Sequence, residues 1–150
     1  MDQVQSWRAD FPVEYLYTTG VAGERFAKTL RERGMLAATR CQRCGVTYLP
    51  PRIYCQRCFA DLSESWVEVP LQGVIHTYTV VPVRATGEPS QSLEVIAYIR
   101  IDGTEGGILG RVAVSPEAVY IGMAVEGVLA PPAERRGAVT DIRYFKPILS

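Results

Sequence analysis

Two Cys-x-x-Cys pairs lie close together in residues 40–58, which read RCQRCGVTYLPPRIYCQRC. Each pair can turn two thiolates to the same side of a tight loop, and two facing loops complete a tetrahedron. All four cysteines of the chain lie in this stretch, and such clustering favours a metal ion over disulfides in a reducing compartment. The predicted metal ligands are Cys41, Cys44, Cys55 and Cys58.

The residue that follows each pair differs between the two loops, or knuckles. Gly45 follows the first pair and suits it, because this position often requires a positive φ angle. Phe59 follows the second pair, and a side chain there leaves the geometry of the second knuckle open.

Zinc is the favoured occupant of a site with four sulfur ligands, and iron stays open because the same geometry suits a mononuclear iron centre. A redox dithiol, disulfides and ordinary buried cysteines are the alternatives. Four protein ligands leave no position for water or substrate, so the metal is expected to stabilise the fold and not to catalyse hydrolysis.

The sequence around the cysteines predicts a helix before them and strands after them. A helix is expected over residues 21–33, capped by Thr18 or Thr19 and stopped by Gly34, because Ala22, Phe26 and Leu30 share one face.

Downstream, alternating apolar residues predict a half-buried strand over 93–101, with Leu93 on its apolar face, followed by a turn and a partner strand over 108–114. Five short strands in about 80 residues favour a small closed or partly open barrel. Further strands are expected over 73–83, 122–129 and 139–145, and one helical turn over 115–117.

The expected fold class is therefore mainly β with an N-terminal helix. We divide the chain into an N-terminal arm and helix (1–36), a metal ribbon (37–67) and a barrel (68–150). At 150 residues and 47% hydrophobic, it can bury a core without disulfides.

Charge is balanced overall but uneven along the chain, with 16 basic and 16 acidic residues. Residues 24–58 hold eight basic residues and two acids, whereas residues 59–108 hold seven acids and two arginines. The helix and ribbon could attract phosphates while the barrel would repel them, although a solvated helix face is an equal explanation. The sequence shows no signal-peptide pattern and no apolar run near the roughly 18–20 residues of a membrane span, so we expect a cytoplasmic protein.

The sequence lacks the common catalytic motifs. It has no Gly-x-Ser-x-Gly elbow, phosphate loop or His-Glu-x-x-His stretch, and its carboxylates are too dispersed to nominate an acid–base pair. The sole histidine, His76, falls in a predicted strand, where a hydrogen-bonded histidine is commoner than a catalytic one. No catalytic residue is predicted, and the chain is expected to bind rather than catalyse.

The order of these features resembles a bacterial and archaeal family of acyl-CoA-associated proteins, over roughly residues 18–148. The resemblance lies in GERF at 23–26, RCQRCG at 40–45, YLPPR at 48–52, CQRC at 55–58, Gly73 before YTVV at 78–81, GMAV at 122–125 and YFKP at 144–147.

This resemblance implies an N-terminal helix, a rubredoxin-like zinc ribbon and an OB-fold. It also implies a non-catalytic accessory subunit of a thiolase-like or related acyl-CoA enzyme, in which the partner supplies the nucleophilic cysteine and the base. CoA or an acyl-CoA is the implied ligand, and Arg52 and Arg57 are candidate contacts chosen from charge alone. The aromatic arm at 1–17 lies outside the resemblance and could dock to a partner or strap the barrel.

Three other functions stay open. A ribbon followed by a barrel also suits single-stranded nucleic acid, although the acidic barrel weakens this alternative, because such binding needs a positive groove with stacking aromatics. Another alternative is an iron-containing electron carrier, and a self-sufficient enzyme is the last.

Overall fold

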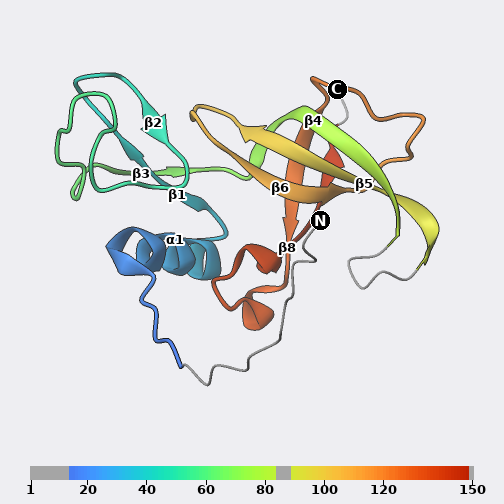
Figure 1. Ribbon diagram of the computed structural model, residues 1–150, viewed down its shortest axis with the longest axis horizontal. Helices are drawn as coiled ribbons and strands as arrows, with labels where there is room; N and C mark the ends of the chain where they lie inside the picture. Colours follow the sequence, from blue (N-terminus) through green and yellow to red (C-terminus); the bar gives the residue numbers. More distant parts are fainter. Residues whose placement is uncertain (1–13, 84–88, 149–150) are drawn as a thin grey trace, which may run out of the picture.

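The computed structural model describes residues 14–83 and 89–148, so most of the predicted arm lies outside the described residues. One helix and a small sheet lie on one side of the molecule, and a barrel lies on the other (Figure 1). The helix is α1 (Gly20–Arg33), and the small sheet contains β1 (Leu36–Arg40), β2 (Thr47–Tyr48) and β3 (Trp66–Val69). The barrel contains β4 (Gln72–Val83), β5 (Pro89–Ile101), β6 (Gly107–Val112), β7 (Ala124–Leu129) and β8 (Ile142–Pro147).

Helix α1 ends where the sequence predicts. Gly34 has a φ angle of 65°, and its N–H donates to the Leu30 carbonyl at 3.1 Å. Thr19 stands at the N-cap, one of the two predicted positions, but its side chain makes no capping hydrogen bond. Leu30 is fully buried and Phe26 is partly buried against the same core, which confirms the predicted apolar face.

The small sheet has β1 at its centre, with β2 and β3 antiparallel on either side. Leu36 and Ala38 of β1 belong to the same hydrophobic core as Leu30 and the barrel residues. The central strand of the ribbon is thus fixed to the rest of the molecule by shared burial. The expected ribbon boundary after residue 67 falls inside β3.

The barrel is closed in the order β4-β5-β6-β8-β7, with β7 returning to β4. The pair β6–β8 is parallel and the other pairs are antiparallel. The fold class is confirmed: one helix, a four-cysteine ribbon and a five-stranded barrel of the OB type. The interior holds Phe145 and the alternate β5 residues Val95, Ala97, Ile99 and Ile101.

Leu93 is exposed, contrary to the prediction that it shares the buried face of β5. The pairing of β5 with β6 stops at Val95, so Leu93 lies where only β4 continues alongside β5. The alternation of apolar residues in the sequence cannot show where a strand extends beyond the barrel.

The last predicted strand starts three residues late, at Ile142, because Val139–Asp141 forms a 3₁₀ turn. Asp141 is buried and accepts backbone N–H bonds from residues 136–138. Burial would raise the pKa of Asp141, but these donors outweigh it and lower the pKa. The expected helical turn at 115–117 is a hydrogen-bonded turn closed by Ser115 and Val119.

No helix among the described residues is long and apolar enough to cross a bilayer.

Candidate functional site

The two cysteine knuckles have the same backbone. In the first, the N–H of Gly45 donates to the Cys41 carbonyl at 2.8 Å, and Gly45 has a φ of 68°. In the second, the N–H of Phe59 donates to the Cys55 carbonyl at 2.9 Å, and Phe59 has a φ of 57°. Within the part of the chain that the structure describes, Phe59 is the one non-glycine residue with a positive φ. The question left open by the sequence is answered, since phenylalanine adopts the conformation of glycine here.

The four sulfurs converge on one point. The Sγ atoms of Cys41 and Cys58 lie 3.6 Å apart, those of Cys44 and Cys55 lie 3.9 Å apart, and all four lie within 4.8 Å of one another. A tetrahedron with metal–sulfur bonds of about 2.3 Å has edges of about 3.8 Å, so the donor set fits zinc. A bound zinc ion would cross-link the two knuckles, with all four coordination positions taken by cysteine.

The Cys44 and Cys55 thiols, whose sulfur atoms lie 3.9 Å apart, have pKa values shifted in opposite directions. The pKa of Cys55 is lowered to about 6, chiefly by the hydroxyl of Tyr48 at 3.3 Å from its sulfur. The pKa of Cys44 is raised to about 12, chiefly by its hydrogen bond with Cys58. A divalent cation removes this conflict, because it stabilises all four thiolates together.

The apolar cluster around the sulfurs is small. The buried cluster around the sulfurs contains only Val46, Tyr48 and Leu62 beside the cysteines, among the residues that the structure describes. This cluster is separate from the main core. We therefore expect the ribbon to depend on its metal for folding.

Arg52 and Arg57, the candidate CoA contacts, both have protein partners. The Arg52 guanidinium donates to Gln56 at 2.7 Å and lies 5.5 Å from the centre of the Tyr48 ring. The Arg57 guanidinium donates to both carboxylate oxygens of Glu105, at 2.9 and 3.1 Å. Their role in binding CoA stays a prediction.

The Arg57–Glu105 pair belongs to a joint between the ribbon and the turn after β5. The N–H of Glu105 donates to the Thr47 carbonyl at 2.8 Å. The next residue, Gly106, packs so closely on Leu49 that a β-carbon would overlap the Leu49 carbonyl. Glycine is thus required at 106 by contact with the ribbon.

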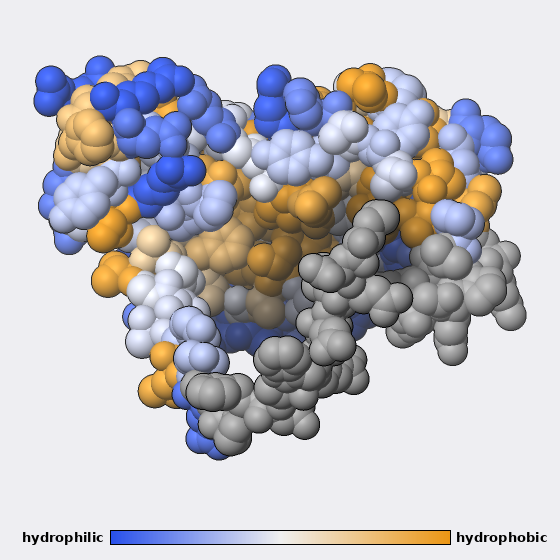
Figure 2. Space-filling model, in the orientation of Figure 1, coloured by the Kyte–Doolittle hydropathy of each residue, from blue (hydrophilic) through white to orange (hydrophobic). Residues whose placement is uncertain are grey.

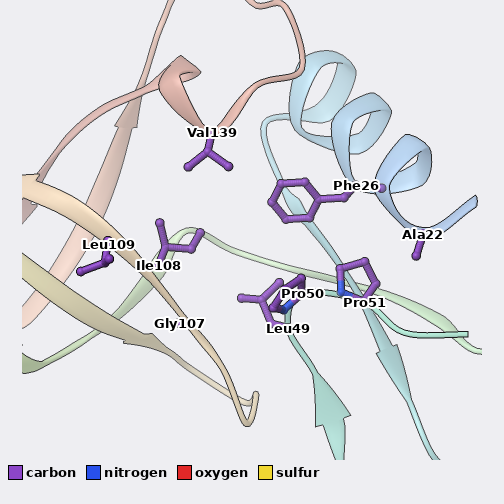
Figure 3. Close-up of a pocket in the computed structure, with 10 residues that line it drawn as sticks. Ala22, Phe26, Leu49, Pro50, Pro51, Gly107, Ile108, Leu109 and Val139 are labelled. Atoms are coloured by element: carbon purple, nitrogen blue, oxygen red, sulfur yellow. The ribbon is translucent and has the colours of Figure 1, made fainter. Parts of the chain in front are cut away.

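An apolar groove opens beside this joint, where the helix, the ribbon and the barrel meet (Figure 3). It encloses about 450 Å³. Figure 2 shows apolar surface gathered in the hollow between the ribbon side and the barrel. Its walls include Phe26 of α1, the Leu49-Pro50-Pro51 segment, Ile108 of β6 and Val139 of the 3₁₀ turn.

No local pattern in the sequence indicates this groove, because four distant segments form it. The only local signal near the groove is the Pro50-Pro51 pair, which interrupts regular structure in the ribbon at that point.

His76 is exposed on β4, and its ring lies 6.1 Å from that of Tyr98.

Two family models match the chain in the order that the fold shows. Residues 30–63 match the model described as "ChsH2, rubredoxin-like zinc ribbon domain", and residues 66–130 match "ChsH2, C-terminal OB-fold domain". The class is therefore a zinc ribbon joined to an OB-fold.

Similar proteins narrow this class to one family. A curated protein of Methanocaldococcus jannaschii, named "DUF35 domain-containing scaffold protein", is 36% identical over 123 residues, covering 79% of this chain and 86% of the relative. The chain belongs to the DUF35 family.

Two solved structures share the fold. A DUF35 protein of unknown function from Sulfolobus solfataricus has a TM-score of 0.61 at 28% identity, covering 73% of this chain and 78% of the other. The structure named "Ltp2-ChsH2(DUF35) aldolase" has a TM-score of 0.55 at 20% identity, covering 83% of this chain and 93% of the other.

Proposed function

We propose that this protein is a non-catalytic, zinc-stabilised scaffold subunit that assembles with a thiolase-like acyl-CoA enzyme and helps to position CoA thioesters. The observation that carries the proposal is its 36% identity to a relative named as a scaffold protein. The four sulfurs leave a metal ion no open coordination position, so the proposal assigns the reaction to the partner.

The groove is the proposed binding site for the CoA thioester. A volume of about 450 Å³ is within the usual range for a small-molecule site, and its apolar walls suit an acyl or pantetheine chain. The phosphates of CoA need cations outside the apolar walls. Arg52 directly follows the Pro51 wall, and Arg57 would have to exchange the Glu105 carboxylate for a phosphate.

The class of the partner rests on the resemblance of the sequence. The name of one similar structure joins a DUF35 chain with an aldolase, but at 20% identity that likeness supports the fold alone. The proposal also places the protein in the cytoplasm, where the clustered cysteines would stay reduced.

An add-back experiment tests the proposal. The thiolase-like enzyme is assayed for thioester turnover alone, with this chain, and with the chain after denaturation as a control. We expect turnover or its Michaelis constant to change only with the folded chain, and the chain alone to be inactive. Unchanged kinetics, or turnover by the isolated chain, would contradict the proposal.

A labelled single-stranded oligonucleotide serves as a second control. The excess of acids in residues 59–108 predicts no binding at physiological salt. Salt-sensitive binding at modest protein concentration would instead support the nucleic-acid alternative.

A further inference from the structure

Tyr48 places a hydroxyl group against one of the four ligand sulfurs. Its oxygen lies 3.3 Å from Cys55 Sγ, which also accepts the backbone N–H groups of Arg57 and Cys58. Within the part of the chain that the structure describes, no other side chain apart from the cysteines forms a hydrogen bond with these sulfurs. A thiolate bound to a metal can only accept a hydrogen bond, so the Tyr48 hydroxyl is the donor when the site is loaded.

The fold buries this hydrogen bond. Tyr48 ends β2 directly opposite Thr39 of β1 and is 3% exposed, and Cys55 is fully buried. Solvent therefore competes little with the hydroxyl, and a hydrogen bond in such surroundings is stronger than one at the surface.

Packing alone does not account for a tyrosine at this position. Phenylalanine would fill the same space, whereas a buried hydroxyl costs free energy unless it finds a partner. Among the described residues, Cys55 is the partner that satisfies the Tyr48 hydroxyl. The polar end of the side chain is thus directed at the metal cage.

The Tyr48 ring is fixed from outside the cage as well. The Arg52 guanidinium lies 5.5 Å from the centre of the ring, at the distance of a cation–π contact. The backbone of Arg52 is held in turn by buried Thr39, whose hydroxyl accepts the Arg52 N–H at 2.9 Å and donates to the Arg52 carbonyl at 2.8 Å. The hydroxyl of Tyr48 therefore has a defined direction before any metal binds.

We propose that Tyr48 is a positioning residue of the metal site, whose hydroxyl donates to the Cys55 thiolate and so strengthens the binding of the metal. Four thiolates around one divalent cation leave net negative charge, and a donor to one sulfur reduces the repulsion among them and disfavours their protonation. Partners of this kind change metal affinity by about 10–100-fold when they are removed. The inference depends neither on the partner enzyme nor on CoA.

The test uses the full chain loaded with cobalt(II), which reports on its sulfur ligands through a thiolate-to-metal charge-transfer band. Tyr48→Phe removes the hydroxyl and keeps the ring. Tyr54→Phe is the matched control, because Tyr54 precedes Cys55 in the chain but is 57% exposed and forms no hydrogen bond with the four described sulfurs.

We expect Tyr48→Phe to bind the metal about 10–100-fold more weakly in competition with a chelator. Its charge-transfer band should move to lower energy, because the Cys55 sulfur becomes more electron-rich, and the control should match the wild type in both measurements. Wild-type affinity in Tyr48→Phe, or equal weakening in the control, would overturn the proposal. Weaker binding with an unmoved band would also overturn it, because that result would show a role in packing alone.

A measurement on the wild-type chain keeps the proposal testable if Tyr48→Phe does not fold. In the chain loaded with cadmium-113, we expect the Tyr48 hydroxyl proton to exchange slowly with water and to show a coupling to the cadmium nucleus through the hydrogen bond. A hydroxyl proton that exchanges freely and shows no coupling would overturn the proposal.

Discussion

The two knuckles of the ribbon share one backbone geometry but face different surroundings. Gly45, in the first knuckle, lies in a cleft shared with the turn between β5 and β6. Phe59, at the same position of the second knuckle, presents its ring to solvent. Both make the same hydrogen bond back to the first cysteine of their pair, so the two knuckles form the same backbone turn with and without a side chain at this position.

Removal of one ligand from either knuckle should have the largest effect. Cys41→Ser and Cys55→Ser are both expected to lose the metal and unfold the ribbon, because its separate cluster is small. Metal-binding free energies of about 10–16 kcal/mol in zinc-finger peptides give the scale of the loss. Metal content by mass spectrometry and the NMR spectrum measure it. If either variant kept one metal ion per chain, the cysteines of the two knuckles would not contribute equally to metal binding.

A substitution in the joint between the ribbon and the turn after β5 should have the next largest effect on stability. Gly106→Ala forces a β-carbon into the Leu49 carbonyl, and overpacking of this kind destabilises a protein by about 1–3 kcal/mol. Chemical denaturation measures the change. A loss of less than about 1 kcal/mol would show that the ribbon does not pack on this turn as described.

The two knuckles are compared most directly by substituting the residue that follows each cysteine pair, Gly45 or Phe59. Gly45→Ala should destabilise the protein by about 1–2 kcal/mol, because alanine strains a φ of 68°. Phe59→Gly should be neutral or slightly stabilising, since relief of strain is partly offset by the greater freedom of glycine in the unfolded chain.

Chemical denaturation of both metal-loaded variants measures the sign of each change in the free energy of unfolding. A loss of more than about 1 kcal/mol in Phe59→Gly, the size of that unfolded-state offset, would mean that the exposed ring contributes to folding.

The ion pair between the second knuckle and the barrel should have the smallest effect. Arg57→Gln is expected to cost about 0.2–1 kcal/mol, because both partners of the pair with Glu105 are half-exposed. A double-mutant cycle with Glu105→Gln measures the coupling, which should shrink as salt is raised. Coupling well above this range would mean that the joint depends on charge rather than on packing.

Local patterns in the sequence predicted the four-cysteine cluster and most of the fold. The spacing of the cysteines defines two facing loops, Gly34 ends the helix, and alternation along β5 identifies its buried face. These signals are local because each depends on residues within a few positions of one another.

Features that depend on distant segments could not be predicted in this way. The groove needs Phe26, Leu49 and Val139 to meet, and Leu93 is exposed only because β6 ends beside Val95. The knuckle imposes a positive φ on Phe59, although a residue with a β-carbon prefers a negative φ. Backbone propensity therefore predicts the wrong conformation at this position.

The most direct test of the account is the mass, by light scattering, of the species formed when the metal-loaded chain is mixed with a thiolase-like acyl-CoA enzyme. We expect one stable species whose mass includes both polypeptides. Two separate species with the masses of the free proteins, at concentrations where both are folded, would contradict it.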